Sequence, residues 1–504
     1  MELYPLNLSP SSFEEATFHF SRLVERLGSP ETTALAHDEL EKMIRTDGFE
    51  VLRLLLQGHL DARHAAEKRE PMEGDNGVLR IPLRTRSRRL VTVFGEVEVN
   101  RTVLAAPGHD SLMPLDAELN LSSGSFSFGV VRLVAEESSR GSYVETIDAI
   151  DRTTGAHVAK RQAEELTQQA STDFDEFYET RAVVPPAADD NIIVVSVDGK
   201  GVVVRTEDLR EPTRKAAEKG KHKLEKRLSR GEKRNRKRMA TVAAVYSIAP
   251  NPRTPEEVIN ESQKLDSEKE TPRPKDKRVW ASLVKSTADV IGDAFDEAMA
   301  RDPEHLHPLV VLVDGNAHQI EKVRETARRL GVELYLILDI IHVIEYLWKA
   351  VWCLFGHGDP KAEEWVTVHL LSILQGKATD VAAGIRRSAT LRELSTSARE
   401  PMDTCADYIL DHKDLMHYER YLQQGFPIAT GVIEGACRHL IKDRMDITGA
   451  RWSLAGAEAV LRLRSLRSSG DFEEYWAFHL KAELQRNHLA RYATHDFIEL
   501  RRAA

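Results

Sequence analysis

The chain has few cysteines and no long apolar run. Three of its 504 residues are cysteine, and Cys353, Cys405 and Cys437 lie far apart in the sequence. An odd number of scattered cysteines excludes a disulfide scaffold and a zinc ribbon with paired cysteines, and it is typical of a reducing compartment. The longest apolar runs, such as residues 309–313, are far shorter than the ~20 residues that span a bilayer. We therefore expect no association with membranes.

Several short motifs are also missing. The opening sequence MELYPLNLSPSSFEE has neither the basic start nor the apolar stretch of a secretory signal, which favours a cytoplasmic location. No GxxxxGK[ST] motif is present, so a bound nucleotide is not expected. The histidines show neither HExxH nor HxxxH spacing, so we assign no zinc site.

Charge is distributed unevenly along the chain. The whole sequence carries −10, yet residues 214–238 contain thirteen Lys or Arg and three Glu, a net charge of +10. A solvated loop between two strands is one interpretation. Contact with a phosphate backbone is the other, because so much local charge repels itself unless a polyanion neutralises it. The residues of this segment that we assign to DNA binding are Lys233, Arg234, Arg236, Lys237 and Arg238.

Changes of hydrophobic period divide the chain into predicted segments. They are an N-terminal helical region (1–75), a β-hairpin region and loop (76–122), a helix-turn-helix (123–182), the first part of a mixed-sheet core (189–350), a helical insertion (351–427), the last helix of the core (428–470) and a C-terminal helical tail (471–504). Within them we expect a helix that ends at Asp47-Gly48, a hairpin about Gly95 and a loop over 114–125. The predicted class is multidomain α/β (α+β).

Three short helices with tight glycine turns are predicted at about 128–139, 142–152 and 157–169. This is the pattern of a helix-turn-helix, although a packing unit without a DNA role has the same pattern. The third helix carries Lys160, Arg161 and Gln162 in its first turns. These side chains suit contacts with phosphates and with base edges in the major groove.

The core segment reads as strands followed by alternating strands and helices. Strands are predicted at 191–200, 201–205, 239–249, 309–315 and 332–339, with the first two paired as a hairpin. Antiparallel strands first and βαβ units afterwards indicate a mixed sheet. From 340 to about 421 the pattern is helical throughout.

Acidic residues follow the apolar strands. Asp198, Asp314 and Asp339 each end such a run, where a single acid often only caps a turn or helix. Convergent carboxylates, however, repel unless a cation lies between them, and Mg²⁺ or Mn²⁺ prefers such oxygen ligands. Two such ions are the usual device for phosphodiester chemistry. Glu434 is the best candidate for the third carboxylate.

Neighbours of these acids have predicted roles as well. Arg438 and Lys442 share a helical face with Glu434 and would contact phosphates. Asp339 and His342, three residues apart, either bind metal or phosphate near the site or cap a helix and bond at the sheet edge. Trp452 is expected in the core rather than stacked on a base.

Taken together, Asp198 in SVDGKG, Asp314 in VLVDGN and Glu434 in TGVIEGACRHLIKDRMDITGARWS resemble the acidic triad of the DDE transposases of bacterial insertion sequences. The resemblance is to the ISKra type, which is related to the mutator-like group. LDIIHVIEYLW, with Asp339 and His342, is similar to the Asp-x-x-His segment of that group. VFGEVEVNRTVL, PLDAELNL and GSYVETIDAI are also similar, so the resemblance covers roughly residues 50–480.

The resemblance implies a ribonuclease-H-like catalytic core interrupted by a helical insertion before the last acid. It also implies two Mg²⁺ ions, replaceable by Mn²⁺, on Asp198, Asp314 and Glu434. The expected partners are the terminal inverted repeats of the element, target DNA and further copies of the chain, at the bacterial nucleoid. Two alternatives stay open: a catalytically silent DNA-binding protein derived from a transposase, and an actin-like ATPase.

Overall fold

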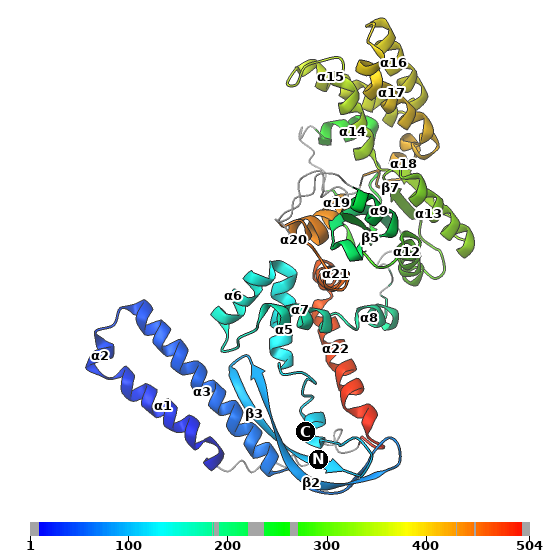
Figure 1. The fold of residues 1–504 in the computed structure, drawn as a ribbon. Helices are drawn as coiled ribbons and strands as arrows, with labels where there is room; N and C mark the ends of the chain where they lie inside the picture. Colours follow the sequence, from blue (N-terminus) through cyan, green and yellow to red (C-terminus); the bar gives the residue numbers. More distant parts are fainter. Residues whose placement is uncertain are drawn as a thin grey trace. The chain divides into compact units, whose positions relative to one another are not determined.

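The computed structural model describes residues 10–183, 185, 191–219, 236–262, 271–429, 431–447 and 450–495. It is a mixed α+β protein with two compact units (Figure 1). Unit 1 comprises Met1–Thr180 and Asp471–Ala504, and unit 2 comprises Arg181–Gly470. In the described residues, no helix is both long and apolar enough to cross a membrane.

Unit 1 begins with helices. After the short 3₁₀ helix Pro10–Phe13 come α1 (Glu14–Leu27), α2 (Pro30–Thr33) and α3 (His37–Ala65). The predicted helix end at Asp47-Gly48 is wrong, because α3 continues through both residues. A glycine inside a helix costs only about 1 kcal/mol, and α3 offsets this by packing against α1 and β3 (Gly95–Ala105).

The hairpin about Gly95 is confirmed. β2 (Leu79–Thr92) pairs antiparallel with β3 down to Thr92 and Gly95, and β1 (Met72–Glu73) adds a short third strand. Gly95 has a φ of +124°, which a residue with a Cβ rarely adopts. The loop predicted at 114–125 is partly wrong, because Pro114–Glu118 forms helix α4, with a proline at its first position.

Among the described residues, five more α-helices belong to unit 1. They are α5 (Phe128–Arg140), α6 (Tyr143–Thr153), α7 (Lys160–Gln169), α8 (Phe174–Thr180) and α22 (Phe472–Asn487), followed by a 3₁₀ turn at Leu489–Arg491. Ser127 and Ser142 accept backbone hydrogen bonds at the starts of α5 and α6. The third predicted helix starts at Lys160 rather than at residue 157. The structure thus has helices where the helix-turn-helix was expected, and its DNA role stays a prediction.

Unit 2 is built on a five-stranded mixed sheet. The strands are β4 (Ile192–Val203), β5 (Lys237–Ile248), β6 (Lys275–Ser282), β7 (Leu309–Val313) and β8 (Tyr335–Leu338). Their order is β6-β5-β4-β7-β8, with antiparallel β6-β5-β4 and parallel β4-β7-β8.

The predicted hairpin of 191–200 with 201–205 is wrong, because both form one strand. β4 pairs with β5 without interruption from Ile192 to Val203. Gly201 is not part of a turn. It leaves space for the side chain of Lys237 on β5, because a Cβ at position 201 would lie 2.9 Å from Cδ of Lys237. Asp198 therefore lies inside a strand and not at its end.

Helices cover both faces of the sheet, which explains why β4, β5 and β7 are buried along most of their length. Figure 1 shows α12 (Thr287–Arg301) and α13 (Ala317–Leu330) on one side. On the other lie α19 (Gly431–Ala436), a π-helical segment (Cys437–Lys442) and α20 (Asp443–Met445), with α21 (Leu454–Ser469) against β6. The smaller helices are the 3₁₀ turn Thr206–Asp208, α9 (Glu211–Lys219) and α11 (Pro255–Ser262).

The segment between β8 and α19 is helical, as the sequence predicted. It contains α14 (Ile340–Val351), α15 (Pro360–Leu374), α16 (Ala378–Leu391), α17 (Thr396–Asp411), the 3₁₀ turn Lys413–Leu415 and α18 (Tyr418–Gln423). Contacts of α14 with α15 and α17 join these helices into one body. We call residues 351–427 the insertion, and α14 leads into it from the sheet.

Candidate active site

Two acids lie side by side on neighbouring parallel strands. Ser196 on β4 pairs with Leu312 on β7, so the same register continued by two residues sets Asp198 beside Asp314. Asp198 is part of the ladder with β5, whereas Asp314 directly follows the last residue of β7. Both side chains are half-buried. The sequence thus predicted the neighbourhood of these acids, although it misjudged where β4 ends.

The electrostatics reflect this proximity. Burial raises the pKa of the Asp314 carboxyl, and the nearby carboxylate of Asp198 raises it further. A hydrogen bond from the Asn316 amide and the proximity of His342 act in the opposite direction. Two carboxylates that repel each other at a half-buried sheet edge are a configuration that a cation stabilises.

Cys437 connects the acids to the third predicted ligand. Its thiol Sγ donates a hydrogen bond to Oδ2 of Asp198 across 3.1 Å. Burial raises the pKa of this thiol, and the carboxylates of Asp198 and Glu434 add to the effect. Glu434 lies on α19 three residues before Cys437, and its side chain is exposed. The structure therefore brings Asp198, Asp314 and the Glu434 helix to one region.

The helix after Glu434 departs from the predicted geometry. Cys437–Lys442 is π-helical, so spacing by eight residues does not keep Lys442 on the face of Glu434 as an α-helix would. Arg438 is the second residue of this π-helical segment. All three side chains are nevertheless exposed. Arg438 lies 3.6 Å from a carboxylate oxygen of Asp443. An exposed ion pair of this kind is weak, so Arg438 remains available to a phosphate.

Asp339 and His342 lie at the end of β8. Asp339 is buried and caps α14, where its Oδ1 accepts a hydrogen bond from the Ile341 amide at 2.9 Å. His342 is half-buried and close enough to influence the pKa of Asp314. The capping role of Asp339 is thus observed, while a role in binding metal stays a prediction.

Trp452 fixes the end of β4 to the segment that follows Glu434. Its amide donates to the Val203 carbonyl, and its own carbonyl accepts from the Arg205 amide at 2.8 Å. The indole is buried, donates to the Met445 carbonyl, and lies under the Arg444 guanidinium at 4.6 Å. The prediction that Trp452 belongs to the core is confirmed.

The residues at this edge fit a divalent cation. Oδ1 of Asp198 accepts from the Gly199 amide, and Oδ1 of Asp314 accepts from the Asn316 amide at 2.8 Å. Within the described residues, neither carboxylate forms an ion pair with Lys or Arg, so hydrogen bonds and the nearby His342 offset their mutual repulsion only in part. Hard oxygen donors of this kind suit Mg²⁺ or Mn²⁺.

A second acidic cluster, which the sequence did not reveal, lies in unit 1. Asp173, His479 and Glu483 are buried, and their ligand atoms lie within 4.8 Å of one another. Here a protein cation is already present: Arg486 bonds Asp173 at 2.9 Å and Glu483 at 2.8 Å. Nδ1 of His479 lies 2.6 Å from Oδ2 of Asp173. This cluster is therefore a buried ionic network that ties α22 to α8 rather than a fitting metal site.

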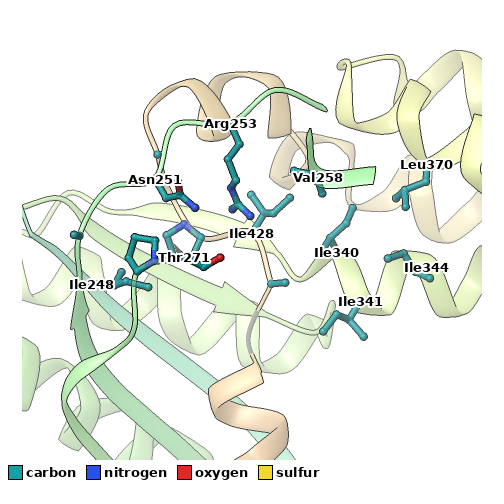
Figure 2. Close-up of a pocket in the computed structure, with 15 residues that line it drawn as sticks. Ile248, Asn251, Arg253, Val258, Thr271, Ile340, Ile341, Ile344, Leu370 and Ile428 are labelled. Carbon is teal, nitrogen blue, oxygen red and sulfur yellow. The ribbon is translucent and has the colours of Figure 1, made fainter. Parts of the chain in front are cut away.

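A cavity of about 410 Å³ lies between the end of β5 and the start of α14, and none of the acids lines it. Figure 2 shows its wall of isoleucines from β5, α14 and the segment before α19, with Asn251, Arg253 and Thr271 as polar neighbours. Because most of the lining is aliphatic and no carboxylate faces it, the cavity does not offer ligands to a metal ion.

Apart from Arg438 and Lys442, described above, the predicted DNA-binding residues fall into three groups. Lys160, Arg161 and Gln162 are exposed in the first turn of α7, where Oε1 of Gln162 also accepts from the Ala159 amide at 3.1 Å. Lys233 and Arg234 lie outside the described residues. The third group is half-buried around the start of β5: Arg236, Lys237 and Arg238.

The third group has contacts within the protein. Arg236 donates to the Thr206 hydroxyl at 2.8 Å, while Arg238 donates to the carbonyls of Leu283 and Asp208 at 2.8 and 2.9 Å. These bonds anchor the start of β5, so we expect Arg238 to contribute more to the fold than to DNA contacts.

Three side chains near the acids were missed in the sequence. Cys437, Tyr408 and His412 all bond to the acids or to the turn beside them. For Cys437 a signal existed, because it lies one helical turn after Glu434. Tyr408 and His412 come from the insertion, about a hundred residues from the acids they approach, and no local pattern marks them.

No protein-family model matches the chain, and no curated protein shows significant sequence similarity to it.

Proposed function

We propose that this protein is a DNA transposase of the DDE type. It would bind the ends of its own insertion sequence, cleave the DNA and join the exposed 3′-OH to target DNA. The observation that carries the proposal is the register of β4 and β7, which sets Asp198 beside Asp314. The contact of Cys437 with Asp198 adds Glu434 to the same region.

The fold supports the proposal in outline. Three antiparallel strands followed by two parallel ones, helices on both faces, and a helical segment before the last acid match what the sequence resemblance implied for a ribonuclease-H-like core. An actin-like ATPase would need phosphate-binding loops rich in glycine, and the sequence has no run of them.

Asp198, Asp314 and Glu434 are the residues that would hold the two Mg²⁺ ions. When bound, such ions activate an attacking oxygen and stabilise the leaving oxygen in phosphodiester chemistry. The exposed Arg438 and Lys442 would neutralise phosphates of the bound strand. The half-buried setting of Asp198 and Asp314 would exclude part of the water that competes with the incoming 3′-OH.

The DNA would be recognised outside this site. The first turn of α7 carries the exposed side chains suited to base contacts, and the basic segment 214–238 supplies phosphate contacts. Cleavage of two element ends in one reaction would require more than one copy of the chain, so we expect a homo-oligomer on DNA.

The test is a cleavage and joining assay with Mg²⁺ on DNA that carries the repeats flanking the open reading frame. Asp198→Asn, Asp314→Asn and Glu434→Gln should each abolish cleavage and joining while end binding stays nearly intact, because the amides keep the shape and lose the charge. Asp339→Asn is the matched control: asparagine caps helices as well as aspartate does, so its loss of activity should be much smaller.

Each outcome is decisive. A triad variant that cleaves at the wild-type rate is not a ligand, and equal loss in Asp339→Asn would make Asp339 the third carboxylate. A wild-type protein that binds the ends but never cleaves them would be the silent DNA-binding protein instead. ATP turnover without DNA would indicate the ATPase.

A further inference from the structure

The insertion contacts the turn that carries Asp314. Oη of Tyr408, on α17, donates a hydrogen bond to the main-chain carbonyl of Asp314 at 2.9 Å. Nε2 of His412, just after α17, lies 2.9 Å from the carbonyl oxygen of Gly315. Both carbonyls come after the last registered pair of β7 with β8. The insertion therefore provides hydrogen bonds at the point where the sheet no longer does.

The fit at this turn is close. Gly315 has a φ of +90°, and a Cβ there would lie 2.7 Å from Oη of Tyr408. A side chain at position 315 would thus displace Tyr408 as well as strain the backbone. Glycine after Asp314 is explained by the approach of a tyrosine from the insertion.

Tyr408 is itself held in place. Its ring stacks on Tyr346 of α14, with centroids 3.9 Å apart and planes 13° from parallel. Burial raises the pKa of the Tyr408 phenol, and Tyr346 and Asp314 add to the shift. The hydroxyl therefore stays protonated at neutral pH and remains a donor.

The neighbouring strand has a similar contact. Tyr418, at the start of α18, is fully buried and donates from Oη to the carbonyl of Leu338 at 2.8 Å. Leu338 is the last residue of β8 and directly precedes Asp339. Side chains of the insertion thus form hydrogen bonds at the ends of β7 and β8, the two strands that Asp314 and Asp339 directly follow.

We propose that Tyr408 and His412 are positioning residues, which fix the peptides on the carboxyl side of Asp314 and so keep its carboxylate directed toward that of Asp198. The insertion then has a role in metal binding without supplying a ligand. This inference rests on the proposed function, because it assumes that Asp314 binds a divalent ion.

The test measures Mn²⁺ binding to the full-length protein by the loss of the electron paramagnetic resonance signal of free Mn²⁺. Tyr408→Phe removes one hydroxyl and keeps the stacked ring, so affinity should fall by up to about tenfold, the effect of one buried hydrogen bond. Tyr346→Phe is the matched control, because within the described residues the Tyr346 hydroxyl makes no hydrogen bond. It should bind as the wild type does.

Variants of His412 give a second, independent test of the positioning role. His412→Leu removes the imidazole whose Nε2 faces the Gly315 carbonyl and whose Nδ1 faces the Tyr408 carbonyl, and it should weaken Mn²⁺ binding. His412→Gln offers a side-chain amide in place of Nε2 and should restore most of the affinity. Thermal unfolding of every variant separates a local change from loss of the fold. Rescue by glutamine with unchanged melting would support positioning.

The two proposals fail in different ways. If the wild type binds Mn²⁺ and Asp314→Asn does not, yet Tyr408→Phe and His412→Leu both bind like the wild type, the positioning role is wrong and the metal site stands. If the wild type binds no Mn²⁺, or if Asp314→Asn binds Mn²⁺ as tightly as the wild type does, Asp314 is not a metal ligand. The positioning role, which depends on that ligand, is then wrong as well.

Discussion

The thiol of Cys437 and the carboxylate of Asp198 form a hydrogen bond although 239 positions separate them in the sequence. One belongs to the π-helical segment after Glu434 and the other to the middle of β4. The bond is thus a direct link between the central strand and the helix of the third acid. A thiol there must stay protonated, since a thiolate would repel the acid beside it.

Cysteine reactivity follows from these surroundings. Burial raises the pKa of the Cys405 thiol to about 12, and burial together with Asp198 raises that of Cys437 as well. Because only the thiolate reacts, we expect iodoacetamide at pH 8 to label the half-buried Cys353 first. Peptide mass spectrometry over a time course measures the order. Early labelling of Cys437 would show that the contact with Asp198 is open in solution.

DNA affinity should fall steeply with salt through the segment 214–238. If about five phosphates are neutralised there, replacing its Lys and Arg by Ser, except Arg236 and Arg238 that anchor β5, should reduce the slope of log K against log salt by about 4 units. Replacing Glu218, Glu225 and Glu232 by Ser is the control, which should not flatten the slope. If log K depends on log salt with the same slope in the wild type and in the basic-segment variant, the segment makes no phosphate contacts and is only a solvated loop. Preference for element ends should persist, since phosphate contacts do not specify sequence.

Recognition of the element ends should depend on Arg161. Its side chain is 90% exposed and, in the part of the chain that the structure describes, pairs only with Glu165 on the same helix, a contact worth little. Arg161→Ala in the full chain should reduce the preference for element ends over random duplex by about 1–3 kcal/mol if it contacts a base. Competition binding measures the affinity for element ends relative to random duplex. If this selectivity is unchanged in Arg161→Ala, Arg161 does not recognise the ends.

Gln162 needs a different design, because it also caps α7. Gln162→Ala would lose the cap and any base contact together, whereas Gln162→Glu keeps the cap and loses the amide donor. We therefore expect both variants to lose about 1–3 kcal/mol of preference for the ends, and the alanine variant alone to unfold at a lower temperature. If Gln162→Glu prefers element ends over random duplex as strongly as the wild type does, Gln162 only caps α7 and contacts no base.

Acid should destabilise unit 1 through Asp173. Burial alone would raise the pKa of this carboxyl, but hydrogen bonds from His479 and Arg486 outweigh burial and lower it. A lowered pKa stabilises the fold above the unfolded value of about 4, and this contribution is lost as pH falls below it.

Asp173→Asn should therefore lower the free energy of unfolding by about 3–5 kcal/mol at pH 7, as for a broken buried pair. As the pH falls from about 5 to 2, the variant should lose less stability than the wild type does. Glu179→Gln, at an exposed acid of α8, is the control and should behave as the wild type does. Urea unfolding at several pH values gives both quantities. Parallel pH curves for Asp173→Asn and wild type would contradict this account.

The sequence predicted features with a strong local period. The hairpin at Gly95, the helices of the insertion and the apolar strands β7 and β8 all have such patterns. β6 was missed because its first half, Lys275–Arg278, is polar and follows a stretch rich in proline. It is an edge strand whose burial starts at Val279, so no full apolar run marks it.

The errors at the site have a common cause, which is that long-range contacts decide local structure. The glycines of β4 indicated a turn, yet pairing with β5 keeps the strand straight. Eight-residue spacing indicated one face for Glu434 and Lys442, yet the second part of that stretch, from Cys437 to Lys442, is wound as a π-helix. Tyr408 and His412 approach the acids only because the insertion folds back onto the sheet.

The discontinuity of unit 1 has a consequence for synthesis of the protein. Its last helix, α22, supplies His479 and Arg486 to the network around Asp173, and the ribosome makes α22 only after all of Arg181–Gly470. At about 5–20 residues per second, the amino-terminal part waits roughly tens of seconds for that helix. During this interval Asp173 lacks His479 and Arg486, its partners on α22, and the surface that α22 later covers is exposed. Unit 2, which is contiguous in the chain, is thus completely synthesised before unit 1 is.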